Sequence, residues 1–517
     1  MNSESQYQIK LFGYCALTQE EILNKFLQSG ASELTSLTGE YIIVIENQDE
    51  AYLISSPYGV CQYYYTLQEN QFFHDDTVIG VLKKSRLPWT WNWTALADLT
   101  LFDHLIENDT LHAQIHRVPR GSILHFKQGH LKTSSLTWEE LNPSFPAKAE
   151  TALNQFNQAI KTWMGDKPVV SMSGGFDSRV ILSGVLQQGG KPLLLTMGYD
   201  DTTDVIVSKK IASALGLDLE LIQLDFADYF KHSQKIVSLT NGTKTIRHWH
   251  TYLYTYHASL DRNSKFFVGT NGEFVRATCY DELDKGILAL KENLNPIPSL
   301  RKFWASFFTY LFKTEELQGL QPELSAQFNP ENQEIRMHRI IDLCHHQFLS
   351  GMNRFYLEQR VRNFHGNGLK LYSENVDWRA PFLTKEWVST TWNLPRGWKF
   401  GSNWHRFAIQ KNYPRLLDFP EEGKSETMPA KAPLFYWHPS KKKYPVVSYS
   451  RYPDWFQSEP AVEFIMDNFN VLEGLIDKNT LASIVKEHQQ KKNRTYTMAF
   501  LLTMTFWLMQ VKEVVDA

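Results

Sequence analysis

The stretch 168-PVVSMSGGFDSRVILSGVLQQGGKPLLLTMG-198 frames the interpretation of the second part of this chain. It opens with an apolar run typical of a buried strand, passes through Ser173-Gly174-Gly175, and continues from Asp177 with the spacing of a helix. A second apolar run, 192–197, follows that helix. Strand, glycine turn, helix and strand in this order are typical of a parallel, doubly wound sheet.

The pattern continues downstream. The segment 202-TTDVIVSKKIASALGL-217 predicts a second helix and 218-DLELIQL-224 a third strand, whereas the chain beyond Gln234 is expected to be mostly helical. At 517 residues the chain exceeds what one hydrophobic core usually holds, so we expect two domains. The predicted boundaries are a β-rich domain over 1–140 and an α/β domain over 150–517, with a linker over 137–150.

The first 140 residues carry strand signals separated by polar turns. A hairpin is predicted over 117–133, with its turn at Gln128-Gly129. The other predicted elements are strands at 39–47, 51–56 and 61–67 and helices at 19–28 and 95–106.

Composition excludes several classes of function. A net charge of −3 without a basic field argues against nucleic-acid binding. The four cysteines lie far apart and form no C-x-x-C pair, which fits a reducing cytoplasm and neither a zinc site nor a disulfide framework. The N-terminus lacks an apolar signal core, and the apolar run 498–511 has 14 residues. That length predicts a buried C-terminal helix and no membrane span.

The glycine turn has the chemistry of a phosphate cradle. Gly174 and Gly175 allow close approach of the backbone, and the helix that follows offers unpaired N–H groups. Neither G-x-x-x-x-G-K-[ST] nor G-x-G-x-x-G is present. The loop carries Asp177 in place of a lysine. A carboxylate beside phosphates requires a bridging cation, and Mg²⁺ is suited to that role. The loop therefore predicts magnesium-pyrophosphate binding and transfer of AMP from ATP.

The sequence S-G-G-x-D-S after a strand resembles the signature of the PP-loop ATP pyrophosphatases. Four further segments resemble, in the same order, the asparagine synthetase-like family: "GEYIIVIENQDEAYLISSPYGVCQYYYT", "IHRVPRGSILHF", "VGTNGE" from Val268 and "VDWRAPFL" from Val376. The resemblance implies an N-terminal glutaminase-like domain of the Ntn type, followed by a PP-loop synthetase domain.

The chain departs from that family at its N-terminus. Glutamine-hydrolysing members begin with Met-Cys, whereas here Asn2 and Ser3 follow Met1, and Cys15 has no free α-amine of its own to act as base. The N-terminal domain is therefore expected to be inactive towards glutamine. The same loss occurs in β-lactam synthetases and lasso-peptide macrolactam synthetases, which use an amine already in the substrate.

The resemblance also implies roles for individual residues. Asp177 and Glu273 are expected to hold magnesium, with Glu273 replacing the family's aspartate and Arg276 compensating for a missing F-G-G-Y. Lys424, with Lys431 as competitor, is expected to be the catalytic lysine, and Asp377 to orient or deprotonate the amine, unless it only pairs with Arg379 at a helix start. The phosphate-binding positions are Ser173, Gly174, Gly175 and Ser178, and those near adenine and ribose are Met172, Met197 and Gly269, the two methionines serving equally well as core.

Two histidine pairs were weighed as metal ligands. His248 and His250 are two residues apart, which would place both on one face of a strand. Without a third ligand we interpret them, like His345-His346, as structural or substrate-contacting residues.

Together these features predict an ATP- and Mg²⁺-dependent, AMP-forming ligase that joins a carboxylate to an amine without hydrolysing glutamine, in peptide or small-molecule biosynthesis. Macrolactam closure of a short peptide, lactam formation and amidation of a metabolite all fit, with an internal or external amine. A degenerate nucleotide-binding relative without turnover is the main alternative. A tRNA-modifying PP-loop enzyme lacks its usual basic surface here. A homodimer or a partner protein from the same pathway is the assembly we expect.

Overall fold

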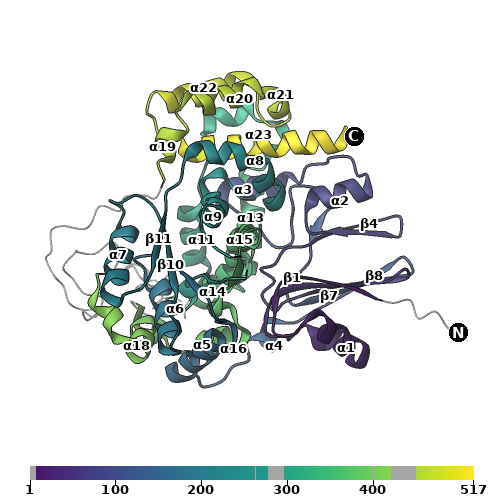
Figure 1. Ribbon diagram of the computed structural model, residues 1–517. Helices are drawn as coiled ribbons and strands as arrows, with labels where there is room; N and C mark the ends of the chain where they lie inside the picture. Colours follow the sequence, from purple (N-terminus) through teal and green to yellow (C-terminus); the bar gives the residue numbers. More distant parts are fainter. Residues whose placement is uncertain (1–6, 262, 277–295, 400–401, 421–449, 517) are drawn as a thin grey trace.

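The computed structural model describes residues 7–261, 263–276, 296–399, 402–420 and 450–516. Within these ranges the protein is mixed α/β, with two antiparallel sheets, one parallel sheet and many helices. Figure 1 shows the antiparallel strands on one side of the molecule, the parallel strands on the other, and the C-terminal helices packed across the top.

The first part of the chain is β-rich, as predicted. Its larger sheet has the order β1-β2-β3-β7-β8 and its smaller sheet the order β5-β4-β6. The strands are β1 (Gln8–Cys15), β2 (Gly39–Glu46), β3 (Glu50–Ser55), β4 (Tyr64–Gln68), β5 (Gln71–Asp75), β6 (His116–Arg117), β7 (Ser122–Lys127) and β8 (His130–Ser135). The helices are α1 (Gln19–Ser29), η1 (Ala31–Leu34), α2 (Val78–Ser85) and α3 (Trp93–Phe102).

Local sequence signals explain two of these elements. The β7–β8 hairpin turns at Gln128 and Gly129, whose φ angles of 50° and 81° are those of a two-residue hairpin turn. Helix α1 begins with a capping box, in which Thr18 and Glu21 satisfy each other's backbone N–H groups. The expected hairpin and helix are thus confirmed.

The segment expected to be a linker contains a short helix, α4 (Trp138–Leu141), before α5 (Ala149–Trp163) begins. The strand-helix alternation then follows as predicted: β9 (Pro168–Ser171), α6 (Phe176–Gln187), β10 (Leu193–Met197), α7 (Thr203–Leu215) and β11 (Leu219–Ile222). The sheet is parallel, in the order β11-β10-β9-β12-β13. Its last two strands, β12 (Lys265–Phe267) and β13 (Asp377–Arg379), have three residues each.

Helices form most of the rest, as expected for the chain beyond Gln234. They are α8 (Phe226–Thr240), η2 (Ile246–His248), α9 (His250–Tyr256), η3 (Gly272–Val275), α11 (Pro296–Phe307), η4 (Thr314–Gly319), α12 (Pro322–Ala326), α13 (Pro330–Leu343), α14 (Leu349–Phe355), the π-helical η5 (Tyr356–His365), α15 (Gly366–Ser373), η6 (Pro381–Leu383), α16 (Lys385–Trp392), α17 (Arg396–Lys399), α18 (Asn403–Asn412), η8 (Pro414–Asp418), α19 (Tyr452–Trp455), α20 (Glu459–Asp467), α21 (Phe469–Leu472), α22 (Lys478–Gln489) and α23 (Thr495–Val515).

The C-terminal helix α23 is longer than the apolar run suggested. It has 21 residues and is long and apolar enough to cross a membrane by length and composition. However, 67% of its most apolar window is buried inside the protein. It packs against α8, α21 and α22, so the expected buried helix is confirmed although its expected length was wrong. Figure 1 shows it, in yellow, running below α20, α21 and α22.

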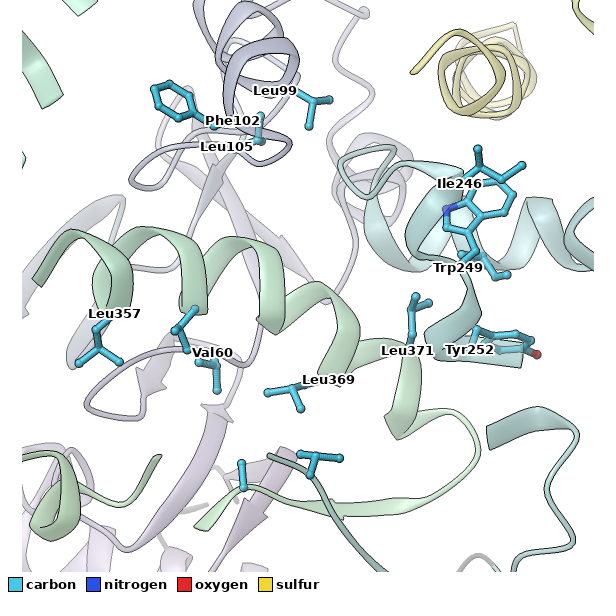
Figure 2. Close-up of a cluster of buried hydrophobic side chains, with 14 of the residues drawn as sticks. Val60, Leu99, Phe102, Leu105, Ile246, Trp249, Tyr252, Leu357, Leu369 and Leu371 are labelled. Atoms are coloured by element: carbon cyan, nitrogen blue, oxygen red, sulfur yellow. The ribbon is translucent and has the colours of Figure 1, made fainter. Parts of the chain in front are cut away.

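One hydrophobic core joins the β-rich part to the helices. Figure 2 shows Val60 of the first part beside the continuous helical segment formed by η5 and α15, with Leu99 and Phe102 on the helix above it, and all belong to one core cluster with Leu357 and Leu371. Leu357 and Leu371 of that segment are fully buried. The two parts of the chain therefore share apolar surface, and the position of η5 is fixed from both sides.

A buried ion pair adds a polar link across the same boundary. Asp98 of α3 accepts a 2.7 Å hydrogen bond from Nε of Arg336 on α13, and its other oxygen lies 3.2 Å from Arg339. The side chains of Asp98 and Arg336 are 0% and 3% exposed. A guanidinium left unpaired at this depth is strongly destabilising.

We predict that Asp98→Asn lowers the stability of the protein by about 3–5 kcal/mol, because it leaves Arg336 buried without its counter-charge. The measurement is the midpoint of thermal and urea unfolding. Glu334→Gln is the matched control, since Glu334 lies on the same helix but pairs with Arg301 at the surface. An equal effect of both substitutions would contradict the prediction.

Candidate functional site

The glycine turn lies at the point where the parallel sheet changes direction. From β9 the chain adds β10 and β11 on one side, and it later adds β12 and β13 on the other. The connections that leave β9 and β12 therefore diverge at the carboxyl edge of the sheet. In open α/β sheets such an edge is where ligands bind.

The turn itself is built by its two serines. The hydroxyls of Ser173 and Ser178 lie 3.1 Å apart, and Gly175 donates its N–H to Ser173 Oγ at 3.2 Å. The N–H of Gly174 donates to a carboxylate oxygen of Asp204 at 2.7 Å. Helix α6 begins at Phe176 without a side-chain cap, so its first N–H groups are oriented towards the turn. The turn already binds one carboxylate oxygen and is suited to phosphate oxygens.

Asp177 projects from the first turn of α6 and holds two cationic or donor groups. Arg276 donates to Oδ2 at 2.7 Å, and His405 of α18 donates from Nε2 to Oδ1 at 2.8 Å. Burial by itself would raise the pKa of Asp177, but Arg276 and His405 outweigh it and the pKa is lowered. Burial lowers the pKa of His405, so this ring is neutral. Asp177 is therefore an ionised carboxylate inside the protein.

The second glycine loop packs directly on Asp177, as the resemblance implied. A Cβ on Gly272 would lie 2.4 Å from Asp177 Oδ1, and a Cβ on Gly269 would lie 3.1 Å from Asp177 Cβ. Asn271 anchors this loop by donating to the carbonyl of Phe382 at 2.7 Å. Only glycine at position 272 permits the contact between the two loops.

Glu273 completes a pair of neighbouring carboxylates. It accepts a 3.0 Å hydrogen bond from the hydroxyl of Tyr356, and its carboxylate lies 4.0 Å from Arg276. Burial, and then the charge of Asp177, raise the pKa of Glu273. A dication between these two carboxylates would remove that repulsion.

The two carboxylates of this site suit magnesium when water and phosphates complete its coordination shell. Among residues 7–516 with described positions, no three histidine, cysteine or acidic side chains are arranged to hold a metal. Magnesium commonly takes one or two carboxylates and completes its shell with water and substrate phosphates. Asp177 and Glu273 match that pattern, although Arg276 now neutralises Asp177.

Of the two methionines expected near adenine and ribose, one lies in the hydrophobic core and the other at the carboxyl edge of the parallel sheet. Met172 is 3% exposed and belongs to the hydrophobic core, and its N–H donates to the carbonyl of Leu195 at 2.7 Å. Met197, the last residue of β10, is only partly buried and lies at the carboxyl edge. Of the two, Met197 is better placed to contact a bound base.

Lys424 and Lys431 lie outside the described residues. The chain enters that segment beside the glycine turn, because Arg179 donates to the carbonyls of Gly174 at 2.9 Å and Phe419 at 3.1 Å. Lys424 follows Phe419 by five residues in the sequence.

Asp377 is not brought to the glycine turn. It begins β13 and pairs in register with Lys265 at the amino end of the sheet, about 13 Å of strand rise before Gly269. It forms ion pairs with Arg379 and Lys265. The pairing with Arg379 that we considered is present, but in a strand and not at a helix start. Asp377 also lines a cavity of about 460 Å³ shared with Tyr14 and Lys370.

The histidine pairs are structural. His248 and His250 lie in η2 and α9, so the expectation of a common strand was wrong, because the Trp249 ring between them packs into the core. His248 lies 2.7 Å from Asp103. His345 and His346 form the turn after α13, and His346 lies 3.2 Å from Asp342.

The cysteines of the first part have no activating surroundings. Burial raises the pKa of both Cys15 and Cys61, and Cys61 Sγ donates to the carbonyl of Glu40 at 3.4 Å. Protonated thiols are poor nucleophiles. Neither has the low pKa that a catalytic cysteine requires.

Sequence reasoning missed four residues of this site. Asp204 and Tyr356 carry no motif signal, and His405 is separated from Asp177 by 228 positions. The position of Arg179 directly after S-G-G-F-D-S was a usable signal. An arginine in the first turn of that helix can reach the carbonyl groups of the glycine turn.

Comparison with known proteins yields little. No protein-family model matches this sequence, and neither does any curated protein. Among solved structures, glutamine phosphoribosylpyrophosphate amidotransferase from B. subtilis, complexed with ADP and GMP, aligns at 10% identity and a TM-score of 0.19. The alignment covers 53% of this chain and 58% of that enzyme. We draw no conclusion about this chain from so low a score.

One buried acid in the first part generates a pH prediction. Glu40 is 1% exposed and accepts a 2.7 Å hydrogen bond from Ser56, and burial raises its pKa to about 8. The unfolded chain releases this proton near pH 4.5. Between these values only the folded protein binds the proton, so stability falls as the pH rises from about 4.5 to 8 and levels off above.

We predict that Glu40→Gln removes this slope, which for one proton is about 1.4 kcal/mol per pH unit. The measurement is urea unfolding of both proteins at pH 5, 6, 7 and 8. Glu33→Gln, at an exposed glutamate on η1, should retain the wild-type slope. Parallel curves for wild type and Glu40→Gln would show that Glu40 is ionised in the folded protein.

Proposed function

We propose that this protein is an ATP-dependent, AMP-forming carbon–nitrogen ligase of the asparagine synthetase-like type. The observation that carries the proposal is the meeting of two glycine loops on Asp177 at the switch point of a parallel sheet. A magnesium-pyrophosphate site needs backbone donors, ionised carboxylates and close backbone approach, and this edge supplies all three.

The proposed first step is adenylation. A carboxylate oxygen of the substrate attacks the α-phosphorus of ATP, the bond from that phosphorus to the bridging oxygen breaks, and pyrophosphate leaves. The N–H groups that begin α6 and the hydroxyls of Ser173 and Ser178 bind the departing phosphates. Asp177 and Glu273 would hold Mg²⁺, which neutralises the phosphate charge. Asp204 must give up the N–H of Gly174 for this to happen.

The proposed second step forms the amide. An amine attacks the acyl carbon, the bond to AMP breaks, and the amine loses one proton. Lys424 is our candidate for stabilising the negative charge of this step. Asp377 has no part in this proposed step, because it lies at the amino end of the sheet and is ion-paired with Lys265 and Arg379.

The first part is proposed to be an Ntn-type domain retained as a scaffold, because its described cysteines, Cys15 and Cys61, are partly buried and have raised pKa values. The amine then comes from the substrate itself, as in macrolactam closure of a short peptide, or from free solution. We place the enzyme in the cytoplasm, acting alone, as a homodimer or with a pathway partner.

A specific observation favours a second candidate, a nucleotide-binding protein without turnover. Both oxygens of Asp177 already accept hydrogen bonds, one from Arg276 and one from His405. A carboxylate neutralised in this way needs no metal. Whether magnesium displaces Arg276 separates the two candidates.

We predict that Asp177→Asn weakens binding of magnesium α,β-methylene-ATP, measured by calorimetry, and lowers AMP formation by roughly 100-fold with any acid and amine that the wild type accepts. The control is Asp166→Asn, at an exposed aspartate just before β9.

Three outcomes are informative. Loss of both readouts in Asp177→Asn supports the ligase. Magnesium-independent nucleotide binding, without AMP from any acid tested, supports the second candidate. Absence of nucleotide binding by the wild type contradicts both.

A further inference from the structure

A second cavity, of about 330 Å³, lies where the end of α3 meets η2, η5 and the start of α23. It is separate from the two glycine loops and from the cavity at Asp377. Half of its fourteen lining residues are apolar or aromatic, namely Leu99, Leu101, Phe102, Phe307, Leu311, Phe364 and Tyr496, and the other half are polar or charged. Figure 2 shows Leu99 and Phe102 on the helix that faces η5. Volume and lining are those of a small-molecule site.

The cavity wall carries more positively charged side chains than negatively charged ones. Arg247 and Arg360 line it, and Asp103 is the one acid among its lining residues. Asp103 is fully engaged, because it accepts from Arg247 and His248 at 2.7 Å and from Thr245 at 3.1 Å. Asp103 therefore neutralises Arg247, and no other acid among the described residues lines the cavity to pair with Arg360.

Arg360 has no counter-charge in the described part of the chain. Its guanidinium lies 4.6 Å from the centre of the Phe364 ring, and no described carboxylate is within ion-pair distance of it. A planar guanidinium stacked on an aromatic ring keeps its N–H edge available for a carboxylate. Arg360 is partly buried and open to the cavity, so its guanidinium is available to an anion that enters there.

The described groups around Arg360 supply no counter-charge to it. Lys244, buried behind the wall, donates to the carbonyl of Phe364 at 3.1 Å and lies 4.2 Å from that ring's centre. Burial lowers the pKa of His248 to about 4 and that of His365 further, and nearby cations contribute to both shifts. These histidines are neutral and add no positive charge, and burial lowers the pKa of Lys244 to about 7, so Arg360 is the unpaired cation among the described residues of the cavity wall.

We propose that this cavity binds a small organic acid, with its carboxylate on Arg360 and its apolar body against Phe102, Phe364 and Tyr496. Arginine binds carboxylate through two parallel hydrogen bonds, which one available guanidinium can provide. The apolar walls favour a carbon body over an inorganic anion. The proposal goes beyond the ligase activity and does not depend on it.

The position of the cavity links it to the candidate nucleotide site. Tyr356 and Arg360 lie four residues apart on η5, and Tyr356 contacts Glu273. π-Helical turns of this kind are frequent at functional sites. A ligand on Arg360 is thus one helical turn from the carboxylate pair.

The test is calorimetric titration of the full-length protein with phenylacetate, 3-phenylpropionate and hexanoate, with phenylacetamide and inorganic phosphate as comparison probes. We expect at least one of the acids to bind and phenylacetamide not to bind. Arg360→Met, which retains the length of the side chain but not its charge, should weaken that binding by roughly tenfold or more. Arg301→Met, at an exposed arginine paired with Glu334, is the matched control.

Folding is checked by thermal melting and by binding of α,β-methylene-ATP. If Arg360→Met does not fold, Arg360→Lys retains the charge without the planar fork and should weaken binding several-fold. Absence of binding by all three acids, equal binding of phenylacetamide, or unchanged affinity in the Arg360 variants would overturn the proposal. Arg360-dependent binding of phosphate alone would overturn the carboxylate assignment.

Discussion

The arrangement of the parallel-sheet part depends on one partly buried charge, the carboxylate of Asp177. A charge removed from water must be paired, and here the partners come from segments that are distant in the sequence. Arg276 arrives from the loop after β12, and His405 arrives from α18. Satisfying Asp177 therefore draws three separate stretches of chain to one edge of the sheet. The same requirement explains the small residues around it, since Gly272 lies where any side chain would overlap the carboxylate.

Much of this architecture was readable from local patterns. The hairpin at Gln128-Gly129 and the alternation from β9 to β11 follow from turn chemistry and hydrophobic spacing, which act over a few residues. The glycine turn and the second loop were also identified, because glycine, serine and acid in close succession have few structural uses. Such signals are visible because the residues that cooperate are neighbours in the sequence.

What escaped prediction depends on contacts between distant segments. β12 and β13 are too short to show a period, and their register places Asp377 beside Lys265 at the amino end of the sheet. His405 is a lone histidine in a helix, and only the fold reveals that it donates to Asp177. The helical placement of His248 and His250 is set by burial of Trp249, which outweighs the alternating pattern. In each case tertiary packing decided what local propensity left open.

The pairing of Asp177 with Arg276 bears on how such a site operates. Two carboxylates without a cation between them repel each other. Burial, and then the charge of Asp177, raise the pKa of Glu273. Arg276 relieves that repulsion from one side, since it lies 2.7 Å from Asp177 and 4.0 Å from Glu273. A dication bound with phosphates would replace this guanidinium and release it towards the phosphate oxygens, for which its planar donors are suited. Glu273 also accepts from Tyr356, so a change in its charge acts directly on the first residue of η5. If the glycine loops bind a ligand as we propose, the shared carboxylate of Glu273 would provide a physical route to the helix that carries Arg360.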